Sequence, residues 1–310
     1  MKTKWYKFGA VVFLLILTLV SAVLWKTGDG HKELKTVTCA DDLEGSRIGG
    51  VRSYMGPEAS GIYFESLLGR DTSAYREYDS FVAAVEGLRA GEVDAIWACD
   101  STADYAVKNY GDLDILDNSD MSATARLSKP RFSFALAVTD DKEGEETRKR
   151  LSDAIDKIRS DGTLGRLVND YIKNAVSTDP FREEDMWSRT DRFRFTHEMS
   201  GSLDIGITGS APPVEMIDED GQPSGFCVAM LDEIACRLCT DINIRILDTE
   251  TAYSQLMAGK IDALFAGADS GNTTQEDKKF LTTTGYLDMY NYKFLVRTPQ
   301  EPETTDGTEE

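Results

Sequence analysis

The chain has 310 residues, of which 41% are hydrophobic, so it can bury a core spread over about two domains or lobes. Asp and Glu number 54 against 34 Lys and Arg, which gives a formal net charge of -20. A charge of this sign repels nucleic acid phosphates and anionic lipid surfaces, so nucleic acid is not expected as a partner.

An apolar segment follows the N-terminus. Residues 8–25 carry no charge and stand behind three lysines; as a helix they would rise about 27 Å, close to the hydrocarbon thickness of a bilayer. The pattern predicts either a cleaved signal peptide or an uncleaved transmembrane anchor with residues 1–7 in the cytoplasm, and both remain open. In either case the rest of the chain, after a linker at 26–40, is expected outside the cytoplasm, secreted or anchored to the cell membrane.

The five cysteines do not form a complete set of intrachain pairs. Cys236 and Cys239 form a CxxC pair inside an apolar helical pattern, and the only histidines are His31 and His197. Because a zinc site needs a second pair of ligands, a core or helix-end role is favoured for the CxxC pair. No metal and no cofactor are expected.

Short apolar strands alternate with helices from residue 41 to residue 130, which is typical of a parallel α/β fold. We predict strands at 47–51, 93–98 and 113–117, and helices at 60–69 and 80–91.

The next part, 131–174, reads as one strand followed by a helix pair. The strand is predicted at 131–138, and the two helices are separated by Gly162. Leu151, Ile155 and Ile158 share one helix face. A connector at 175–200 contains several aromatic residues, so we expect it to pack against the folded part of the chain.

The α/β pattern returns at residue 201 and continues to residue 298. An acidic tail at 299–310 has almost no apolar residue and is expected to be disordered. Before it, we predict strands at 203–208, 242–247, 261–267 and 290–297, and helices at 226–238 and 252–259.

Two stretches of the chain repeat one pattern, LRAGEVDAIWACDS at 88–101 and LMAGKIDALFAGADS at 256–270. In each, a helix ends at a glycine that can adopt the left-handed conformation, Gly91 or Gly259, and a buried strand follows. An acidic turn then stands at the carboxyl end of the strand, where open α/β sheets hold ligands.

The acids of this repeat have two different expected roles. Asp100 and Asp269 follow the strands and are candidates for ligand contact. Asp94 and Asp262 precede the strands, where turns favour aspartate, so a structural role is the better interpretation.

The motifs of the chain resemble a known family. LDIGITGSAPPVEMIDEDGQPSGFCVAMLDEIACRL and LMAGKIDALFAG resemble the first lobe of bacterial solute-binding family 3, the binding proteins of amino-acid ABC importers. DLEGSRIGGV, LRAGEVDAIWACDSTADYAV and RFSFALAV resemble the family's second lobe and its return to the first. Over roughly 35–298 the resemblance implies a two-lobed type II periplasmic binding protein fold, an α/β fold in which helices flank a mixed, mostly parallel sheet in each lobe.

The order of the lobes is inverted relative to the family. The part at 41–130 resembles the second lobe, and the part at 201–298 resembles the first. The simplest account is a circular permutation in which the connector joins the old termini. Lobes exchanged between chains of an oligomer are the alternative. The strands at 131–138 and 290–297 are expected to cross between the lobes.

The sequence departs from the family where the ligand is usually held. Ala211 and Val214 stand beside the Pro-Pro turn in place of aromatics, and Asp277 stands where the resemblance implies a carboxylate-binding arginine. Cys227 and Ala229 replace the family's acids. These departures disfavour an ordinary α-amino acid as the ligand.

The remaining polar residues at the strand ends are the candidate ligand-binding residues. A cationic or amine-bearing solute would neutralise Asp100 and Asp269 if both face it, whereas Arg52 would suit an anionic group. Trp97 lies inside a strand and is more typical of a core. One lobe contributes Thr208, Ser210, Glu215, Asp269, Ser270, Asn272, Thr273 and Thr274, and the other contributes Arg52, Ser53, Tyr54, Trp97, Asp100 and Ser101.

The sequence favours a non-enzymatic protein that closes two lobes on a small polar, amino-acid-like or amine-bearing solute and delivers it to the membrane subunits of an ABC importer. One alternative is a membrane-anchored ligand-sensing or adaptor module. Another is a dehydratase-like enzyme with Glu215, Asp100 and Asp269 as acids or bases. The chain lacks the GxSxG, HExxH and phosphate-loop motifs, so no catalytic residue is assigned.

Overall fold

The computed structural model describes residues 34–51, 75–116, 132–173, 193–194, 196–218, 220–266, 280–289 and 292–299. Thr36–Glu310 form one compact unit, separate from the residues before it. This unit begins inside the predicted linker at 26–40, because Val37 is buried together with Leu43. Within the described ranges no helix has both the length and the apolar character needed to cross a bilayer, and the segment 8–25 lies outside them.

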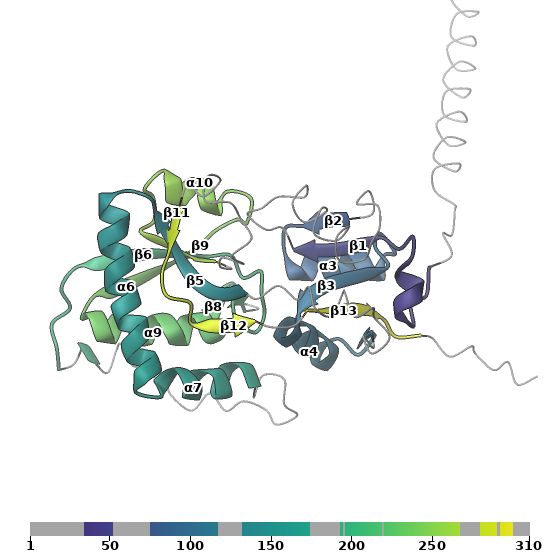
Figure 1. Ribbon diagram of the computed structural model, residues 1–310, viewed down its shortest axis with the longest axis horizontal. Coiled ribbons are helices and arrows are strands. Elements are labelled where there is room, and N and C mark those ends of the chain that lie inside the picture. The colour runs from purple at the N-terminus through teal and green to yellow at the C-terminus, as the bar shows by residue number, and fades with distance from the viewer. Residues whose placement is uncertain are drawn as a thin grey trace, which may run out of the picture. The chain divides into compact units, whose positions relative to one another are not determined.

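The first sheet has five strands in the order β2-β1-β3-β13-β4 (Figure 1). The first three are parallel, and β13 runs antiparallel to both of its neighbours. The elements of this part are the 3-10 helix η1 (Ala40–Leu43), β1 (Ile48–Val51), β2 (Tyr75–Tyr78), α3 (Phe81–Arg89), β3 (Ala95–Cys99), α4 (Asp100–Asn109), β4 (Leu113–Ile115) and β13 (Tyr292–Arg297).

The side chains of β3 alternate between the two faces of the first sheet and belong to two separate apolar clusters. Ile96 and Ala98 are buried with the apolar residues of α3 and α4. Ala95 is buried on the other face with Val37 and Phe294. Because successive side chains of a strand point to opposite faces, both helices must cover the same face of this sheet.

The second sheet has six strands, β11-β5-β10-β6-β9 with β12 added beside β5. The parallel strands β6, β9 and β10 form one side of it, and the strands next to β5 are antiparallel to it. The strands are β5 (Phe132–Thr139), β6 (Ser202–Ile207), β9 (Asp241–Ile246), β10 (Ala263–Ala266), β11 (Phe280–Thr282) and β12 (Leu287–Met289), with the separate hairpin β7 (Met216–Ile217) and β8 (Pro223–Ser224).

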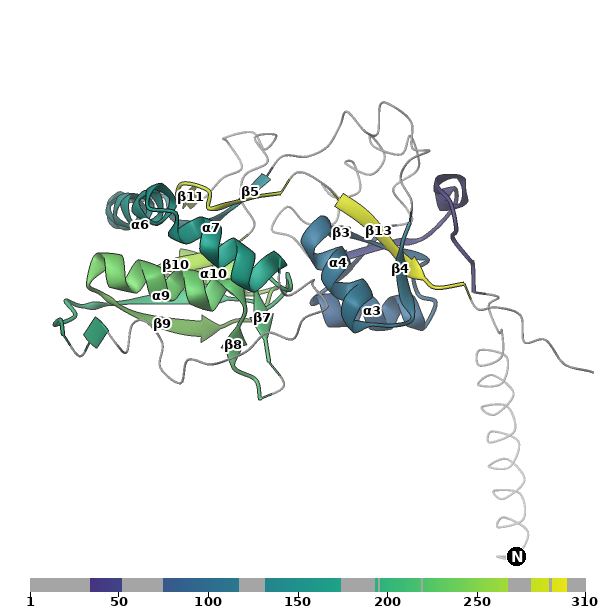
Figure 2. The same ribbon diagram turned by 90° about the horizontal axis from the view of Figure 1, so that it is seen from below.

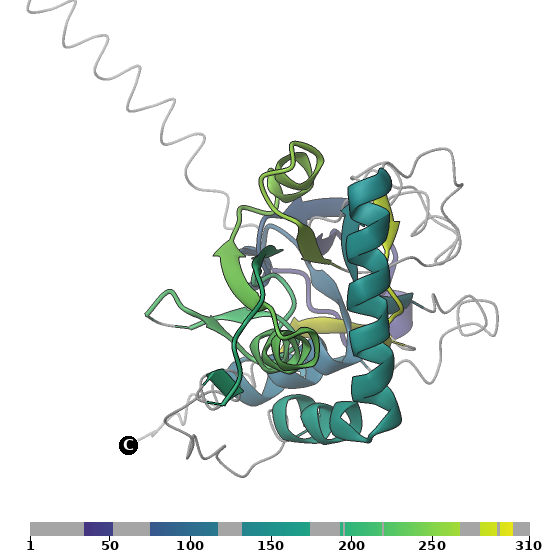
Figure 3. The same ribbon diagram turned by 90° about the vertical axis from the view of Figure 1, so that its left-hand side faces the viewer.

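Helices cover both faces of the second sheet. Leu136 on β5 is buried with residues of α6, α7 and α9, whereas Ala137 is buried with residues of α10. The long helix α6 contacts α9 and leads into α7 (Figures 2 and 3). The helices are α6 (Lys142–Ser160), α7 (Thr163–Val168), the π-helical turn η3 (Asn169–Lys173), α9 (Phe226–Leu238) and α10 (Ala252–Met257).

Two strands lie in the sheet formed mainly by the other half of the chain. β5 follows the first-sheet elements in sequence but lies inside the second sheet, and β13 follows the second-sheet elements but lies inside the first. These are the two segments expected to cross between lobes. The sequence pattern assigns 290–297 to the lobe at 201–298, but the strand that these residues form, β13, lies in the first sheet. The inverted order of the lobes and the lobe-swapped alternative stay predictions.

The predicted helices and strands of the described residues are present, with small shifts at their ends. The side chain of Ser80 accepts a hydrogen bond from the N–H of Ala83, 3.1 Å away, and so caps α3. Gly162 separates α6 from α7, and the α6 residues expected on one face are fully buried. One difference is that α4 begins directly at Asp100, where a turn was expected. The helix predicted at 60–69 lies outside the described residues.

The repeated glycine and aspartate have the same local structure in both parts. Gly91 has φ 70° and Gly259 has φ 65°, the left-handed conformation that avoids a Cβ clash only in glycine. In the first sheet Asp94 accepts a hydrogen bond from the backbone N–H of Arg47 at 2.8 Å and donates its own N–H to the Arg47 carbonyl at 2.7 Å.

Asp262 makes the matching pair of bonds in the second sheet. Its carboxylate accepts from the N–H of Asp204 at 2.7 Å, and its N–H donates to the Asp204 carbonyl at 2.8 Å. We call this arrangement the aspartate clamp, because it ties the start of one strand to its parallel neighbour. The structural interpretation of Asp94 and Asp262 is confirmed.

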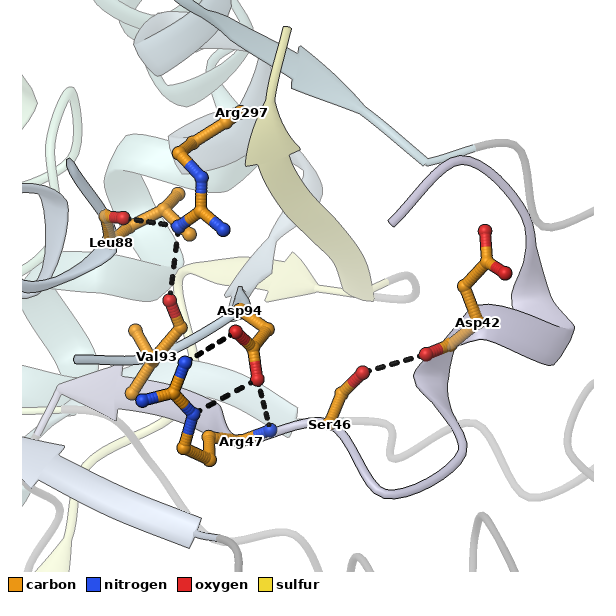
Figure 4. A network of polar contacts seen from close by, with 7 residues as sticks. All are labelled: Asp42, Ser46, Arg47, Leu88, Val93, Asp94 and Arg297. Carbon is orange, nitrogen blue, oxygen red and sulfur yellow. Dashed lines mark hydrogen bonds and ion pairs between the residues drawn. The ribbon is translucent and has the colours of Figure 1, made fainter. Parts of the chain in front are cut away.

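The first clamp is reinforced by two arginines (Figure 4). The Arg47 guanidinium donates to both carboxylate oxygens of Asp94, at 3.0 and 2.6 Å. Burial alone would raise the pKa of Asp94, but the Arg47 hydrogen bonds and charge lower it below its ordinary value. Arg297 on β13 donates to the carbonyls of Leu88 and Val93, so the turn between α3 and β3 is also held by the C-terminal strand.

Replacing the clamp aspartates should destabilise the protein unequally. Asp94→Ala removes a buried, charge-assisted network and should cost about 2 to 3 kcal/mol of unfolding free energy, whereas Asp262→Ala removes one exposed acceptor and should cost about 1 kcal/mol. Urea unfolding of the two variants, with Asp114→Ala as the control for loss of an acid, measures both values. Because the pKa of Asp94 is lowered in the fold, its contribution should be present above its ordinary value of 3.8 and disappear as the pH falls below it. Equal losses for both variants would contradict this account.

Candidate functional site

A short loop at the carboxyl end of β6 brings together three of the predicted ligand-binding residues. Thr208 and Ser210 follow the strand directly, and Glu215 closes the loop through an isolated bridge with Ala211. The peptide bond between Pro212 and Pro213 inside the loop is cis. The loop therefore places two hydroxyl groups where a parallel strand ends.

Glu215 holds this loop from within. It is only 2% exposed, and its Oε1 accepts hydrogen bonds from the N–H of Thr208, from the N–H of Gly209 at 2.7 Å, and from the Thr208 hydroxyl at 2.9 Å. The hydroxyls of Thr208 and Ser210 lie 2.7 Å apart. Glu215 therefore sets the conformation of the loop, in which Thr208 and Ser210 are half-buried.

Burial perturbs three titratable groups near the loop. It raises the pKa of Glu215 to about 7, against the lowering effect of the backbone N–H groups of Thr208 and Gly209. Burial, with a smaller effect of the Glu215 charge, raises the pKa of Cys227 to about 12. Burial followed by the charges of Glu215 and Cys227 raises the pKa of Tyr286 as well.

Tyr286 was not singled out from the sequence. Its hydroxyl is buried and has no hydrogen-bond partner among the residues that the structure describes. Its ring packs between the rings of Phe226 and Phe265, at centroid distances of 6.0 and 5.0 Å. The only sequence signal is a tyrosine at the end of the threonine-rich run LTTTGYL, which does not distinguish a buried phenol from a strand-end residue.

The second group of predicted residues lies at the carboxyl end of β3. Asp100 opens α4, and its carboxylate accepts the backbone N–H of Ser101 at 2.9 Å. Cys99 is buried, with its sulfur 3.0 Å from the Thr102 hydroxyl and 3.6 Å from the Ser101 hydroxyl. An acid in the first turn of a helix is favoured by the helix dipole, so Asp100 has a structural role in addition to any contact with a solute.

One apolar cluster connects the two strand ends. Cys99 at the end of β3 is buried in the same cluster as Val214 of the 208–215 loop and as Tyr286. A hydrogen bond from the Thr249 hydroxyl to the carbonyl of Asp79, 2.8 Å long, also joins the parts that contain the two sheets.

Of the other candidates, one has a packing role and the rest lie outside the residues that the structure describes. Trp97 is partly buried and packs against the apolar cluster of the first sheet that contains Ala95 and Phe294, which is the core role that its position inside a strand favours. That Asp100 and Asp269 face one solute stays a prediction. The residues outside the described ranges are Arg52, Ser53, Tyr54, Asp269, Ser270, Asn272, Thr273 and Thr274.

The CxxC pair lies at a helix end. Cys236 is 5% exposed in the core, and Cys239 ends α9 in the left-handed conformation, with φ 49°. Neither forms a disulfide bond with another described cysteine. The described part of the chain contains no group of three or more His, Cys, Asp or Glu residues arranged to hold a metal ion.

A family model matches part of the chain. Residues 203–303 match the model described as "Bacterial extracellular solute-binding proteins, family 3", which covers about a third of the sequence and includes the 208–215 loop. No curated protein matches the chain significantly.

Several solved structures are similar to the chain at low identity. The alkanesulfonate-binding protein SsuA of Xanthomonas axonopodis pv. citri, bound to MOPS, is 12% identical, with a TM-score of 0.37 over 81% of this chain and 65% of that one. The ligand-binding component of an ABC-type import system from Staphylococcus aureus, with zinc bound, is 8% identical, with a TM-score of 0.39 over the same shares.

A regulator of another class is similar at the same level. CbnR, a LysR family transcriptional regulator, is 11% identical, with a TM-score of 0.41 over 95% of this chain and 76% of that one. This chain covers 65% of the length of each of the two binding proteins described before it. A similarity this low does not show which ligand or partner this chain has.

Two substitutions separate the roles of the Glu215 carboxyl group. Glu215→Gln keeps an oxygen acceptor for the loop and should be about as stable as the wild type, or more stable, at pH 7.5. Glu215→Ala leaves buried donors unpaired and should cost about 1 to 3 kcal/mol of unfolding free energy. Chemical unfolding at fixed pH measures both.

The pH dependence gives a second measurement. Because the pKa of Glu215 rises from 4.5 to about 7 on folding, the folded state binds the extra proton, and wild-type stability should fall as the pH rises through that window. The fall should be absent in Glu215→Gln, which does not titrate. A flat difference between the two proteins from pH 4.5 to pH 7 would be incompatible with a buried, titrating carboxyl group.

Proposed function

We propose that this chain is an extracytoplasmic solute-binding protein and not an enzyme: its two lobes close on a small polar solute and deliver it to the membrane subunits of an ABC importer. The observation that carries the proposal is the match of residues 203–303 to family 3 of the extracellular solute-binding proteins. The matched region contains the strand-end loop in which Glu215 orients the hydroxyls of Thr208 and Ser210.

The topology supports a closing motion. β5 and β13 are the segments by which the chain passes from one sheet into the other. Two strands that link two lobes can act as a hinge, because a few residues at their ends absorb the change in backbone angles. The circular permutation, with its connector at 175–200, belongs to this proposal.

The solute is proposed to be amino-acid-like or amine-bearing. Thr208 and Ser210 supply hydroxyl groups, and Asp100 supplies a negative charge at the other strand end. A cation bound by Asp100 would offset the cost of holding a carboxylate away from water. The absence of the family's aromatic and arginine side chains from their usual positions in the sequence favours a solute other than an ordinary α-amino acid.

The site of action is proposed to be outside the cytoplasm. The segment 8–25 would either direct export and be removed or keep the protein at the membrane beside its importer. The net charge of -20 suits a soluble part that stays away from anionic lipid headgroups.

A thermal-shift screen of the full chain in mild detergent tests the proposal. The panel contains L-arginine, L-lysine, putrescine, glycine betaine, L-glutamate and taurine. A binding protein should be stabilised by at least one compound, in proportion to its concentration, and should return that compound unchanged. Consumption of the compound would indicate an enzyme, and no stabilisation by any compound would remove the solute-binding proposal in favour of an adaptor.

The amine preference is tested by one residue. Asp100→Ala should weaken binding of the stabilising cationic compound about tenfold or more, the loss typical of a desolvated charge pair. Asp114→Ala, which removes an equal charge from β4 of the same sheet, should leave the affinity unchanged in isothermal titration calorimetry. Equal affinity of Asp100→Ala and the wild type would show that Asp100 does not contact the solute.

A further inference from the structure

The outer edge of β9 is an open hydrogen-bonding edge in the described part of the chain. β9 is the last strand of the second sheet and pairs only with β6. The N–H of Asp241 donates to Gly201 and the N–H of Leu247 donates to Ile207, so the odd-numbered residues turn their backbone groups towards β6. The even-numbered residues Ile242, Ile244 and Ile246 therefore turn theirs outward, and no described residue bonds to these groups.

This edge lacks two of the devices that prevent pairing, a proline and a covering strand among the described residues, although it carries two charged side chains. The strand reads DINIRI, with no proline and no glycine, and no described residue covers it with another strand. Ile246 is 45% exposed, although isoleucine normally avoids water. An open hollow of about 510 Å³ adjoins the edge, lined by Ile244–Leu247 together with Gly221, Gln222, Pro223, Gln255, Lys260 and Ile261. None of these residues belongs to the 208–215 loop, so the edge is separate from the candidate solute site.

The charges of β9 are complementary to a second, antiparallel copy of the same strand. Along the strand, Asp241 precedes Asn243 by as many residues as Arg245 follows it. An antiparallel pairing centred on Asn243 places Asp241 opposite Arg245 of the other copy, and this occurs twice by symmetry. The same register places Ile242 opposite Ile244, and both carry outward backbone groups, as a hydrogen-bonded pair requires.

We propose that the β9 edge pairs antiparallel with the β9 edge of a second copy of this chain about a two-fold axis through Asn243. This joins two six-stranded sheets into one and produces the isologous interface typical of two-fold dimers. The interface is additional to the proposed solute-binding function and does not depend on it.

Existing ion pairs hold the two charged side chains near the edge. Arg194 donates to the Asp241 carboxylate at 2.9 Å, and Arg245 lies 3.0 Å from Asp204. Arg245 is 56% exposed and Asp241 is 34% exposed, so both retain surface for a second partner. In the proposed dimer, Asp241 and Arg245 therefore keep these ion pairs and also contact each other across the interface.

A charge-complementation experiment on the full chain in mild detergent tests the pairing. Wild-type protein, Asp241→Arg and Arg245→Asp are each examined by sedimentation equilibrium over a range of concentrations. Each variant presents like charges to its own copy and should dimerise at least about tenfold more weakly than the wild type. An equimolar mixture of the two variants restores opposite charges in both positions and should form a heterodimer of wild-type strength.

The mixture separates the interface from effects on folding or on residues 8–25. Loss of the Arg194 or Asp204 ion pairs is the same before and after mixing, so mixing can rescue only a contact between chains. Asp114→Arg and Arg148→Asp, changed on β4 and α6, are the matched controls and should dimerise like the wild type. A wild-type protein that stays monomeric at every concentration overturns the proposal. Binding of the edge to an extended segment of another protein, without dimer formation, overturns it as well. So does a mixture that associates no better than its components.

Discussion

Each sheet of this protein depends on one strand supplied by the other part of the chain. β5 contacts β10, β11 and β12 in the second sheet, and β13 lies between β3 and β4 in the first. Both are interior strands, so neither sheet is complete when the other part of the chain is absent. This constraint accounts for Thr36–Glu310 forming one compact unit in spite of two sheets and separate apolar clusters. It also limits any closing motion to a bend at the ends of the shared strands.

The internal repeat has a physical explanation in the aspartate clamp. A helix that turns back into a parallel strand needs a left-handed residue and an acceptor for the free N–H of the neighbouring strand. Gly91 with Asp94 and Gly259 with Asp262 meet these two needs in the same way. The environments differ, since Asp94 is buried beside Arg47 and Asp262 is exposed. The repeated sequence therefore reflects a helix-to-strand geometry that both sheets share. This geometry places no constraint on the residues that follow each strand.

The candidate site combines an inner and an outer layer. Glu215, Cys227 and Tyr286 are buried, and the charge of an ionised Glu215 adds to the effect of burial in keeping the Cys227 thiol and the Tyr286 phenol neutral. Glu215 supports a loop that also carries the hydroxyls of Thr208 and Ser210. Glu215, one of the predicted ligand-binding residues, thus positions two others, Thr208 and Ser210. The β9 edge belongs to the same sheet as β6, but the hollow beside it shares no residue with this loop.

Local patterns in the sequence were sufficient for most of the longer elements, because periodicity and capping depend on neighbours within a few residues. They did not predict β2, α4, β11 or β12. The buried face of α6, the stop at Gly162 and the glycine before each repeated strand follow from that rule. Only tertiary structure decided the partners of β5 and β13, the burial of Glu215, and the burial of a Tyr286 hydroxyl that has no hydrogen-bond partner in the described part of the chain. The reason is that strand pairing and desolvation depend on residues far away in the chain, and a local pattern contains no information about those residues.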